Sequence, residues 1–340
     1  MPTEVIKVVD PDNGSGTDYT SLSAWEAGEQ QDLVTNDRIA TAKCRCTSGS
    51  ADTTAVTING WTTDSTHYIK IWTDPNENYR HDGKWNGTKY RLEINDWESS
   101  IIYILEANVR IEGLQFKTTG GGKQYFLYFY ILASGEACKW YVSKNIFYKG
   151  TSSVDNAVKY LPYDSGNTYT YNNIFIDVDV GIYTVDWSNT LHCIYNNTFH
   201  SLTTYGIRRY ATGEVRTRNN LFKSCATDTY NLTASNQDYN ATNNSSLGYE
   251  AQAHDRLSQT FAFVDEANDD FHLASTDTGA RNYGANLSSD PYLSFSDDID
   301  GQTRPGETAW DIGADEYVPA GGAFKPYWSH NSNVLIGGQP

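Results

Sequence analysis

The sequence lacks any apolar run near the roughly 18 residues that a membrane-spanning helix needs. Basic residues are also few, since 25 Lys and Arg stand against 42 Asp and Glu, giving a formal net charge of −17. Such a charge opposes binding to a nucleic-acid backbone or an anionic membrane, so we expect neither as a partner. Residues 1–5 lack the basic and apolar regions of a secretory signal, which favours folding in a cytoplasm.

Cysteine and histidine also lack the patterns that would indicate cross-links or a metal. The five cysteines are odd in number and include no CxxC pair, and Cys44 and Cys46 are too close together for an ordinary disulfide. We therefore expect reduced, mostly buried thiols. The seven histidines show no HxH or HxxxH spacing, so structural roles are favoured for them.

What the chain does contain is a repeated tripeptide, Asn-x-Phe. Its four copies are Asn145-Ile146-Phe147, Asn173-Ile174-Phe175, Asn197-Thr198-Phe199 and Asn220-Leu221-Phe222. A second Asn precedes the last three copies, and a further Asn-Asn pair, Asn243-Asn244, follows them. A period of about 24 residues indicates stacked units that share one continuous core.

Each repeat contains short β-prone runs and no helical periodicity. Runs of β-branched and aromatic residues, separated by Asn, Gly, Asp and Thr, predict strands and turns. We expect the asparagines to stack in a ladder at a left-handed corner of successive coils, and the phenylalanines to stack inside the core. The sequence therefore predicts an all-β fold, a single right-handed parallel β-helix of about ten coils.

The chain is expected to divide into four parts. Residues 1–35 should form an N-terminal cap with a short helix over residues 21–31, because Ser23 and Glu26 have capping-box spacing. Residues 36–295 should form the coils, with residues 73–89 projecting as a loop. Residues 296–318 are a closing segment, and residues 319–340 an extended C-terminal docking tail.

Both ends of the chain resemble a known family. Thr17-Asp18-Tyr19-Thr20-Ser21-Leu22-Ser23-Ala24-Trp25-Glu26 is similar to the opening of right-handed parallel β-helix proteins from bacteria and phages. Residues 298–305, with residues 310–317, resemble the closing motif of β-helix domains called choice-of-anchor Q. The resemblance spans nearly all of the chain to residue 318 and implies the fold, but it says almost nothing of function.

Parallel β-helices also resemble pectate lyases, polygalacturonases and the hydrolases of phage tailspikes. Polygalacturonase-like enzymes combine Asn-Thr-Asp, Asp-Asp, Gly-His-Gly and Arg-x-Lys on neighbouring coils. This chain has Asp269-Asp270 and Asp297-Asp298 near the end of the expected rod, but neither Gly-His-Gly nor Arg-Ile-Lys. The departure argues against that activity.

A glycosidase of another type would need two carboxylates about 5 to 10 Å apart on one face. Asp179 and Asp186 are weak candidates, because they fall on coils next to Arg208 and Arg209. No second acid stands in register with Asp179 on the next coil. The alternative is a solvated outer face on which an aspartate forms a salt bridge with one of the two arginines.

The closing segment concentrates carboxylates, which suggests a metal. Calcium favours oxygen-rich sites, so calcium is the one cofactor to consider, with candidate ligands at Asp298, Asp300, Asp311 and Asp315. The alternative is that Asp300 and Asp311 hold turns and that Arg304 pairs with one of them.

Tryptophans are unusually dense near one end of the expected rod, at Trp61, Trp72, Trp85 and Trp97. Exposed aromatic rings stack on sugar rings, and exposed apolar patches mark binding sites, so these four are the carbohydrate-binding candidates. The alternative, which we favour, is that they fill the irregular early coils and the cap.

The tail of residues 319–340 is aromatic and apolar, and it is too short to fold alone. Its assembly candidates are Phe324, Tyr327, Trp328, Val334, Leu335 and Ile336, which we expect to dock on the rod, on a second copy or on another protein. The tail looks like the extended C-terminal arms of virion proteins from tailed phages.

These observations favour a non-enzymatic structural or adhesive protein, most of all a phage virion component such as a decoration, fibre or spike protein. Its partners would be other virion or surface protein subunits, and it would reside in the virion. One alternative is a β-helix that binds polysaccharide or cleaves it as a lyase or glycoside hydrolase. Another is a bacterial cell-surface protein. A homo-oligomer is compatible with each of these, but no pattern indicates three-fold packing.

Overall fold

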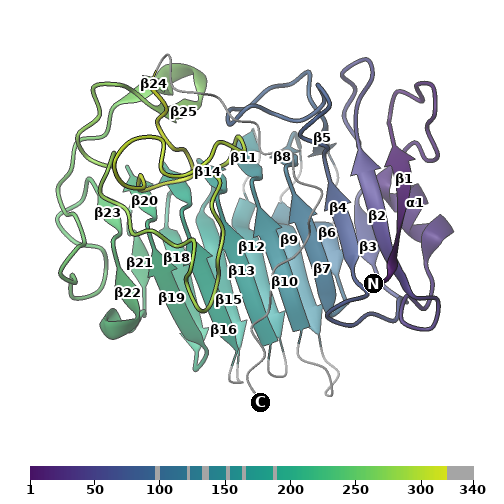
Figure 1. The fold of residues 1–340 in the computed structure, drawn as a ribbon, viewed down its shortest axis with the longest axis horizontal. Helices are drawn as coiled ribbons and strands as arrows, with labels where there is room; N and C mark the ends of the chain where they lie inside the picture. Colours follow the sequence, from purple (N-terminus) through teal and green to yellow (C-terminus); the bar gives the residue numbers. More distant parts are fainter. Residues whose placement is uncertain are drawn as a thin grey trace.

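The strands of the chain wind into three parallel sheets that are visited in turn, which is the arrangement of a parallel β-helix (Figure 1). This computed structural model describes residues 1–95, 100–120, 123–131, 138–150, 154–162, 166–186 and 190–319. The sheets have nine, seven and seven strands. The predicted parallel β-helix is confirmed, with fewer coils than the ten or so expected, because the chain leaves the regular winding after Thr242.

The first sheet has the strand order β1-β2-β4-β7-β10-β13-β16-β19-β22. Its strands are, in that order, Thr3–Val9, Arg38–Cys44, Ile69–Trp72, Asn108–Glu112, Cys138–Ser143, Gly166–Tyr171, Leu191–Tyr195, Glu214–Arg218 and Gln237–Asp238. The second sheet, β5-β8-β11-β14-β17-β20-β23, consists of Arg91–Ile94, Gln115–Thr118, Ile146–Gly150, Ile174–Ile176, Thr198–His200, Leu221–Lys223 and Ala241–Thr242. The third, β3-β6-β9-β12-β15-β18-β21, consists of Val56–Ile58, Ser100–Ile104, Lys123–Ile131, Val154–Pro162, Val180–Asp186, Tyr205–Ala211 and Thr229–Tyr230.

The asparagines of the repeat form the predicted ladder at the corner between the first and second sheets. Asn173, for example, donates from its backbone N and its Nδ2 to Oδ1 of Asn197, at 3.0 and 2.9 Å. The ladder runs through Asn145, Asn173, Asn197, Asn220 and Asn240. Its last step spans 20 residues, so Asn240 takes the place that the period alone would give to Asn243 or Asn244.

The residue before each ladder asparagine turns the corner in the left-handed backbone conformation. Its φ is between 50° and 57° at Lys144, Asn172, Asn196 and Asn219. Asparagine tolerates this conformation better than most residues, which explains why Asn pairs mark the repeat. Gly113 occupies the same corner one coil earlier, with φ 76°.

The phenylalanines of the repeat stack inside the rod. Rings of successive coils lie 4.8 to 5.0 Å apart between centroids and are nearly parallel, in the series Phe116, Phe147, Phe175, Phe199 and Phe222. All five are fully buried. This spacing matches the distance between neighbouring strands. Each ring therefore stacks directly on the ring of the next coil, in the register that the backbone hydrogen bonds set. Residues 113–116 are therefore a copy of the repeat in which the asparagines are replaced.

The N-terminal end of the rod is covered by the expected helix, α1, at Leu22–Glu29. Its N-cap is Ser21, whose Oγ accepts from Ala24 N, rather than the expected Ser23. Glu26 therefore lies within the helix, where it binds Asn59 N.

The stretch of residues 73–89, expected to project, instead lies against later parts of the chain. His81 is buried and its Nε2 lies 2.8 Å from Lys144 O, while Lys84 pairs with Asp270. The physical reason is that buried polar groups need hydrogen-bond partners, and the coils and the returning chain supply them to His81 and Lys84.

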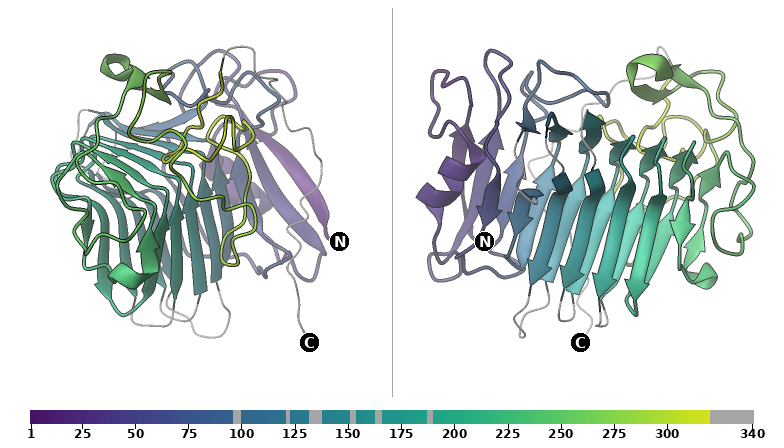
Figure 2. Two further views of the ribbon diagram at one scale, coloured as in Figure 1. Left: turned by 60° about the vertical axis from the view of Figure 1, so that its left-hand side comes forward. Right: turned by 180° about the vertical axis from the view of Figure 1, so that it is seen from behind.

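After Thr242 the chain folds back along the rod. It forms an antiparallel pair, β24 (Phe263–Asp265) and β25 (Asp270–Leu273), and the short 3₁₀ helices η1 (Ala234–Asn236) and η2 (Glu266–Asn268) lie nearby in the sequence. Apolar residues of this returning chain pack on the outside of the first and second sheets. Seen from behind, the third sheet carries no described segment on its outer face (Figure 2, right).

The cysteines and the helices agree with the composition of the chain. All five cysteines are buried and free, as predicted. In the described part of the chain, no helix is both long and apolar enough to cross a membrane.

Candidate functional site

The outer face of the third sheet, which no described segment covers, carries a row of aromatic and cationic side chains. One register position on six successive strands is occupied by Tyr103, Tyr128, Lys159, Tyr183, Arg208 and Tyr230, which we call the Tyr/cation row. The residue before each of them, such as Ile102 or Leu127, is buried in the core. Since successive side chains of a strand point to opposite faces, the row faces outward.

The cations of this row are held between tyrosine rings. Lys159 Nζ lies 4.7 Å from the ring centroids of both Tyr125 and Tyr128, and 5.8 Å from that of Tyr183. Arg208 lies 4.7 Å from Tyr183 by the same measure. Cation–π contacts of this kind fix long side chains that would otherwise move freely. The row is thus a preorganised surface rather than a set of independent side chains.

A second outward row runs beside the first and widens the apolar surface. Tyr130, Leu161, Val185 and Tyr210 are its members, in register along β9, β12, β15 and β18. Tyr130 also lies 5.6 Å from Tyr128, and Tyr210 is 47% exposed. Tyr210 and Tyr230 are exposed and the other members of the two rows are half-buried, so the rows form a continuous, partly accessible aromatic band. This face is therefore the strongest candidate binding surface.

Asp179, a weak catalytic candidate, lies at the edge of this face and is already engaged. Its Oδ1 accepts from Lys149 Nζ at 3.0 Å and from Thr203 Oγ1 at 2.5 Å. The partner is therefore Lys149, not the arginines expected from the sequence. Asp186, the other candidate, ends β15, but its side chain lies outside the described residues.

Trp85, from the stretch of residues 73–89, forms an aromatic pair with Tyr148 of β11 in the second sheet. Trp85 and Tyr148 lie 5.3 Å apart between ring centroids, with Lys117 Nζ 5.6 Å from each ring. Partial burial, and then the charge of Asp177, raise the pKa of Asp269. The charges of both aspartates also contribute to a raised pKa of Tyr148, after burial. The charges of Asp269 and Asp177 therefore act at Tyr148, whose ring pairs with Trp85.

The four candidate tryptophans are dispersed. Trp61 is 6% exposed and stacks on Trp25 of the cap helix, so its ring lies inside the N-terminal end. Trp72 is half-buried on the first sheet beneath Lys70, whose Nζ lies 3.6 Å from its ring centroid. Trp85 belongs to the pair with Tyr148, and Trp97 lies outside the described residues. The assembly candidates of the tail, residues 324–336, also lie outside them.

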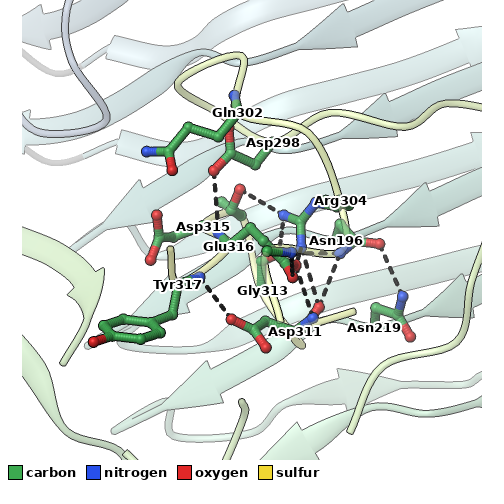
Figure 3. A network of polar contacts seen from close by, with 12 residues as sticks. Asn196, Asn219, Asp298, Gln302, Arg304, Asp311, Gly313, Asp315, Glu316 and Tyr317 are labelled. Atoms are coloured by element: carbon green, nitrogen blue, oxygen red, sulfur yellow. Dashed lines mark hydrogen bonds and ion pairs between the residues drawn. The ribbon is translucent and has the colours of Figure 1, made fainter. Parts of the chain in front are cut away.

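The closing motif forms a buried polar network with Arg304 at its centre (Figure 3). The fully buried guanidinium donates to Glu316 Oε2 at 2.9 Å and to the backbone oxygens of Gly313 and Ala314 at 2.9 and 2.8 Å. Its carboxylate partner is Glu316, not Asp300 or Asp311. A planar guanidinium suits several convergent acceptors, which explains an arginine at this position.

Two of the metal candidates in this motif are occupied by backbone amides. Asp298 accepts from the backbone N of Asp300, Gln302 and Glu316. Asp311 accepts from Asn282 N at 2.6 Å and Tyr317 N at 2.7 Å. These bonds hold turns of the returning chain, the alternative that the sequence offered for Asp311.

The other two metal candidates, Asp300 and Asp315, meet His272. Their candidate ligand atoms all lie within 4.8 Å of one another. His272 Nδ1 lies 2.5 Å from Asp270, and Nε2 lies 2.8 Å from Asp300. Burial would lower the pKa of His272, but the hydrogen bond to Asp300 and the charges of Asp315 and Asp300 raise it to about 11.

This cluster fits a charge network better than a calcium site. Calcium takes six to eight oxygen ligands, whereas the cluster offers an imidazole and two carboxylates. An imidazole with a carboxylate at each nitrogen favours the doubly protonated ring, which has no lone pair for a metal. The cluster therefore joins β25 to the closing motif through ion pairs.

No protein-family model matches this sequence, and no curated protein is significantly similar to it. The candidate surface must accordingly be judged from its own chemistry. The Tyr/cation row was not found from the sequence, although aligned coils contained a signal. Gly181-Ile182-Tyr183 and Gly206-Ile207-Arg208 occupy equivalent positions, and their last residues belong to the row.

Proposed function

We propose that this protein is a non-enzymatic adhesive β-helix that binds polysaccharide along the Tyr/cation row. The observation that carries the proposal is the repetition of ring or cation at one register of six successive strands. Aromatic faces stack on the C–H faces of sugar rings, and cations bind hydroxyl or acidic groups. Because the row follows the axis of the rod, an extended polymer can contact several members at once, which adds their weak affinities.

The setting of this function is proposed from resemblance. The opening and closing motifs are similar to those of choice-of-anchor Q β-helix domains, and the tail resembles arms of phage virion proteins. A virion fibre, spike or decoration protein that docks through residues 319–340 on other virion subunits fits both resemblances. A bacterial cell-surface β-helix protein is the alternative setting, and polysaccharide is a fitting ligand in either.

Binding is tested with the full chain against a panel of soluble bacterial and plant polysaccharides, by affinity electrophoresis. Tyr183→Ala is expected to weaken binding about two- to tenfold, since an aromatic contact is worth roughly 0.5–1.5 kcal/mol. Tyr292→Ala is the matched control, because Tyr292 is 42% exposed and contacts Arg216 of the first sheet. An equal loss of affinity in Tyr183→Ala and Tyr292→Ala, or no binding by the wild type, would overturn the proposal.

A second candidate function is polysaccharide cleavage, favoured by the aromatic pair of Trp85 and Tyr148 and by the raised pKa of Asp269, to which burial and then the charge of Asp177 contribute. A carboxyl group with a raised pKa is suited to proton donation, and glycosidases combine such an acid with a second carboxyl group. The measurement is the release of reducing ends from the same panel. Activity that is lost in Asp269→Asn would establish this alternative, whereas no release by the wild type would reject it for those polymers.

A further inference from the structure

We infer that the polymer taken by the Tyr/cation row is an acidic polysaccharide with an anionic group on about every second sugar. The inference rests on the proposed function, because it requires that a polysaccharide binds at the row. It adds the charge of the ligand and the spacing of that charge. Both follow from the order of side chains along the row and from how the cations are held.

The row alternates between rings and cations over five strands, in the order Tyr128, Lys159, Tyr183, Arg208 and Tyr230. Neighbouring strands lie about 4.8 Å apart, so the two cations are separated by about 10 Å. One sugar of an extended polymer is about as long as one strand spacing. Successive sugars that lie along the row therefore meet a ring and a cation in turn.

Arg208 retains capacity for an anionic ligand, and Lys159, which donates one hydrogen bond to Tyr125 Oη, has two further N–H groups. Arg208 stacks between Tyr183 and Tyr205, at 4.7 and 5.6 Å from the ring centroids. Its buried Nε has no hydrogen-bond partner among the described residues. Because Nε itself has almost no accessible surface, a carboxylate or sulfate oxygen would bind at the terminal nitrogens of the guanidinium, with a charge-assisted bond. Ring stacking uses the flat face of the guanidinium and leaves its edge to such an oxygen.

The net charge of the whole chain limits how acidic the polymer can be. A chain with a net charge of −17 repels polyanions, so each anionic group needs a cation at its own position. A polymer charged on every sugar would place half of its anionic groups over tyrosine rings, where no cation of the row can pair with them. A neutral polymer would stack on the rings but offer the cations only uncharged hydroxyl oxygens, which are weaker acceptors than a charged group. Intermediate charge density therefore gives the best match.

The test uses one glucan backbone prepared with none, about half or nearly all of its sugars carboxylated. Affinity of the full-length protein is expected to be highest for the half-carboxylated polymer and to fall with added salt. Arg208→Gln should lower that affinity about tenfold, the effect of one charge-assisted hydrogen bond, and leave affinity for the neutral glucan within about twofold. Arg216→Gln is the matched control, because Arg216 stacks on Tyr292 at another face.

Each outcome decides between the two proposals. Equal affinity for the neutral and half-carboxylated glucans overturns this inference and leaves the proposed function standing. Highest affinity for the fully carboxylated glucan keeps an acidic ligand but overturns the spacing of one charge in two sugars. Absence of binding to all three polymers, together with none in the wider panel, overturns both. The unfolding temperature of each variant is measured as well. If it is unchanged, a lower affinity does not result from loss of folded protein.

Discussion

Replacing Asn197 by alanine is expected to lower the free energy of unfolding by about 4 kcal/mol. Asn197 is fully buried at the centre of the asparagine ladder. Its Oδ1 accepts from N and Nδ2 of Asn173, and its Nδ2 donates to the backbone oxygens of Thr170 and Tyr195 and to Asn220 Oδ1. The amide nitrogen has only two hydrogens, so its three contacts count as two donated bonds. With the two accepted bonds, at about 1 kcal/mol each, they give the estimate, and a buried N–H left without an acceptor adds to it.

The assay is urea unfolding followed by tryptophan fluorescence. Asn76→Ala is the control, since Asn76 is exposed and its change should stay within about 0.5 kcal/mol. Asn197→Asp provides a second comparison, because it keeps the shape but replaces the donating amide with an acceptor that faces other acceptors. It should be at least as destabilising as alanine at neutral pH. An Asn197→Ala midpoint indistinguishable from that of Asn76→Ala would refute the reasoning.

Three further expectations concern the core and the buried charges. Phe175→Ala should cost about 3 to 5 kcal/mol in urea unfolding, because it opens a cavity between two stacked rings; a loss near that of a surface variant would contradict this. Burial, which outweighs the hydrogen bond from Trp61 N, raises the pKa of Glu106 from 4.5 to about 7. As pH rises, the unfolded chain loses this proton near pH 4.5, whereas the folded chain keeps it to about pH 7, so the free energy of unfolding falls between these two values. Glu106→Gln should therefore have a higher unfolding temperature than the wild type only above about pH 7. Calcium or a chelator should leave the unfolding temperature unchanged, because His272 stands as a cation between Asp270 and Asp300; a calcium-dependent rise would contradict that interpretation.

The ladders were predictable because the same residue recurs at the same corner. Stacked amides at 3.1 Å or less and stacked rings near 5 Å need identical neighbours, so selection for packing leaves a period in the sequence. The end of the ladder was less predictable. Asn240 stands 20 residues after Asn220, because the last coil is shorter, and the expected period therefore points to Asn243 instead.

The Tyr/cation row escaped prediction for the opposite reason. Its members share a position in the coil but not an identity, and the turns between them vary in length, so Tyr128 and Lys159 are further apart in sequence than Tyr183 and Arg208. An outward position has no packing constraint that would demand one residue type. Only the register of the strands shows that these residues are neighbours.

The closing motif was recognised as a cluster of acids, but its chemistry depended on distant partners. His272 reaches Asp300 across 28 residues, and Asp298 is occupied by amides of its own segment. Spacing alone does not show whether an aspartate will face a metal, an amide or an imidazole. That choice is made by the docking of the returning chain, which is a tertiary event.

The returning chain also sets an order of events during synthesis. Asn172 Nδ2 donates to Asp297 O across 125 residues, and Asn196 Nδ2 donates to Gly313 O across 117. The ribosome makes these coils well before the segment that docks on them, and the outer tyrosines Tyr169 and Tyr195 stay uncovered in the interval. A nascent rod therefore presents an adhesive flank to neighbouring chains until the segment arrives. Slower translation over residues 250–317 would lengthen the interval in which this flank is exposed.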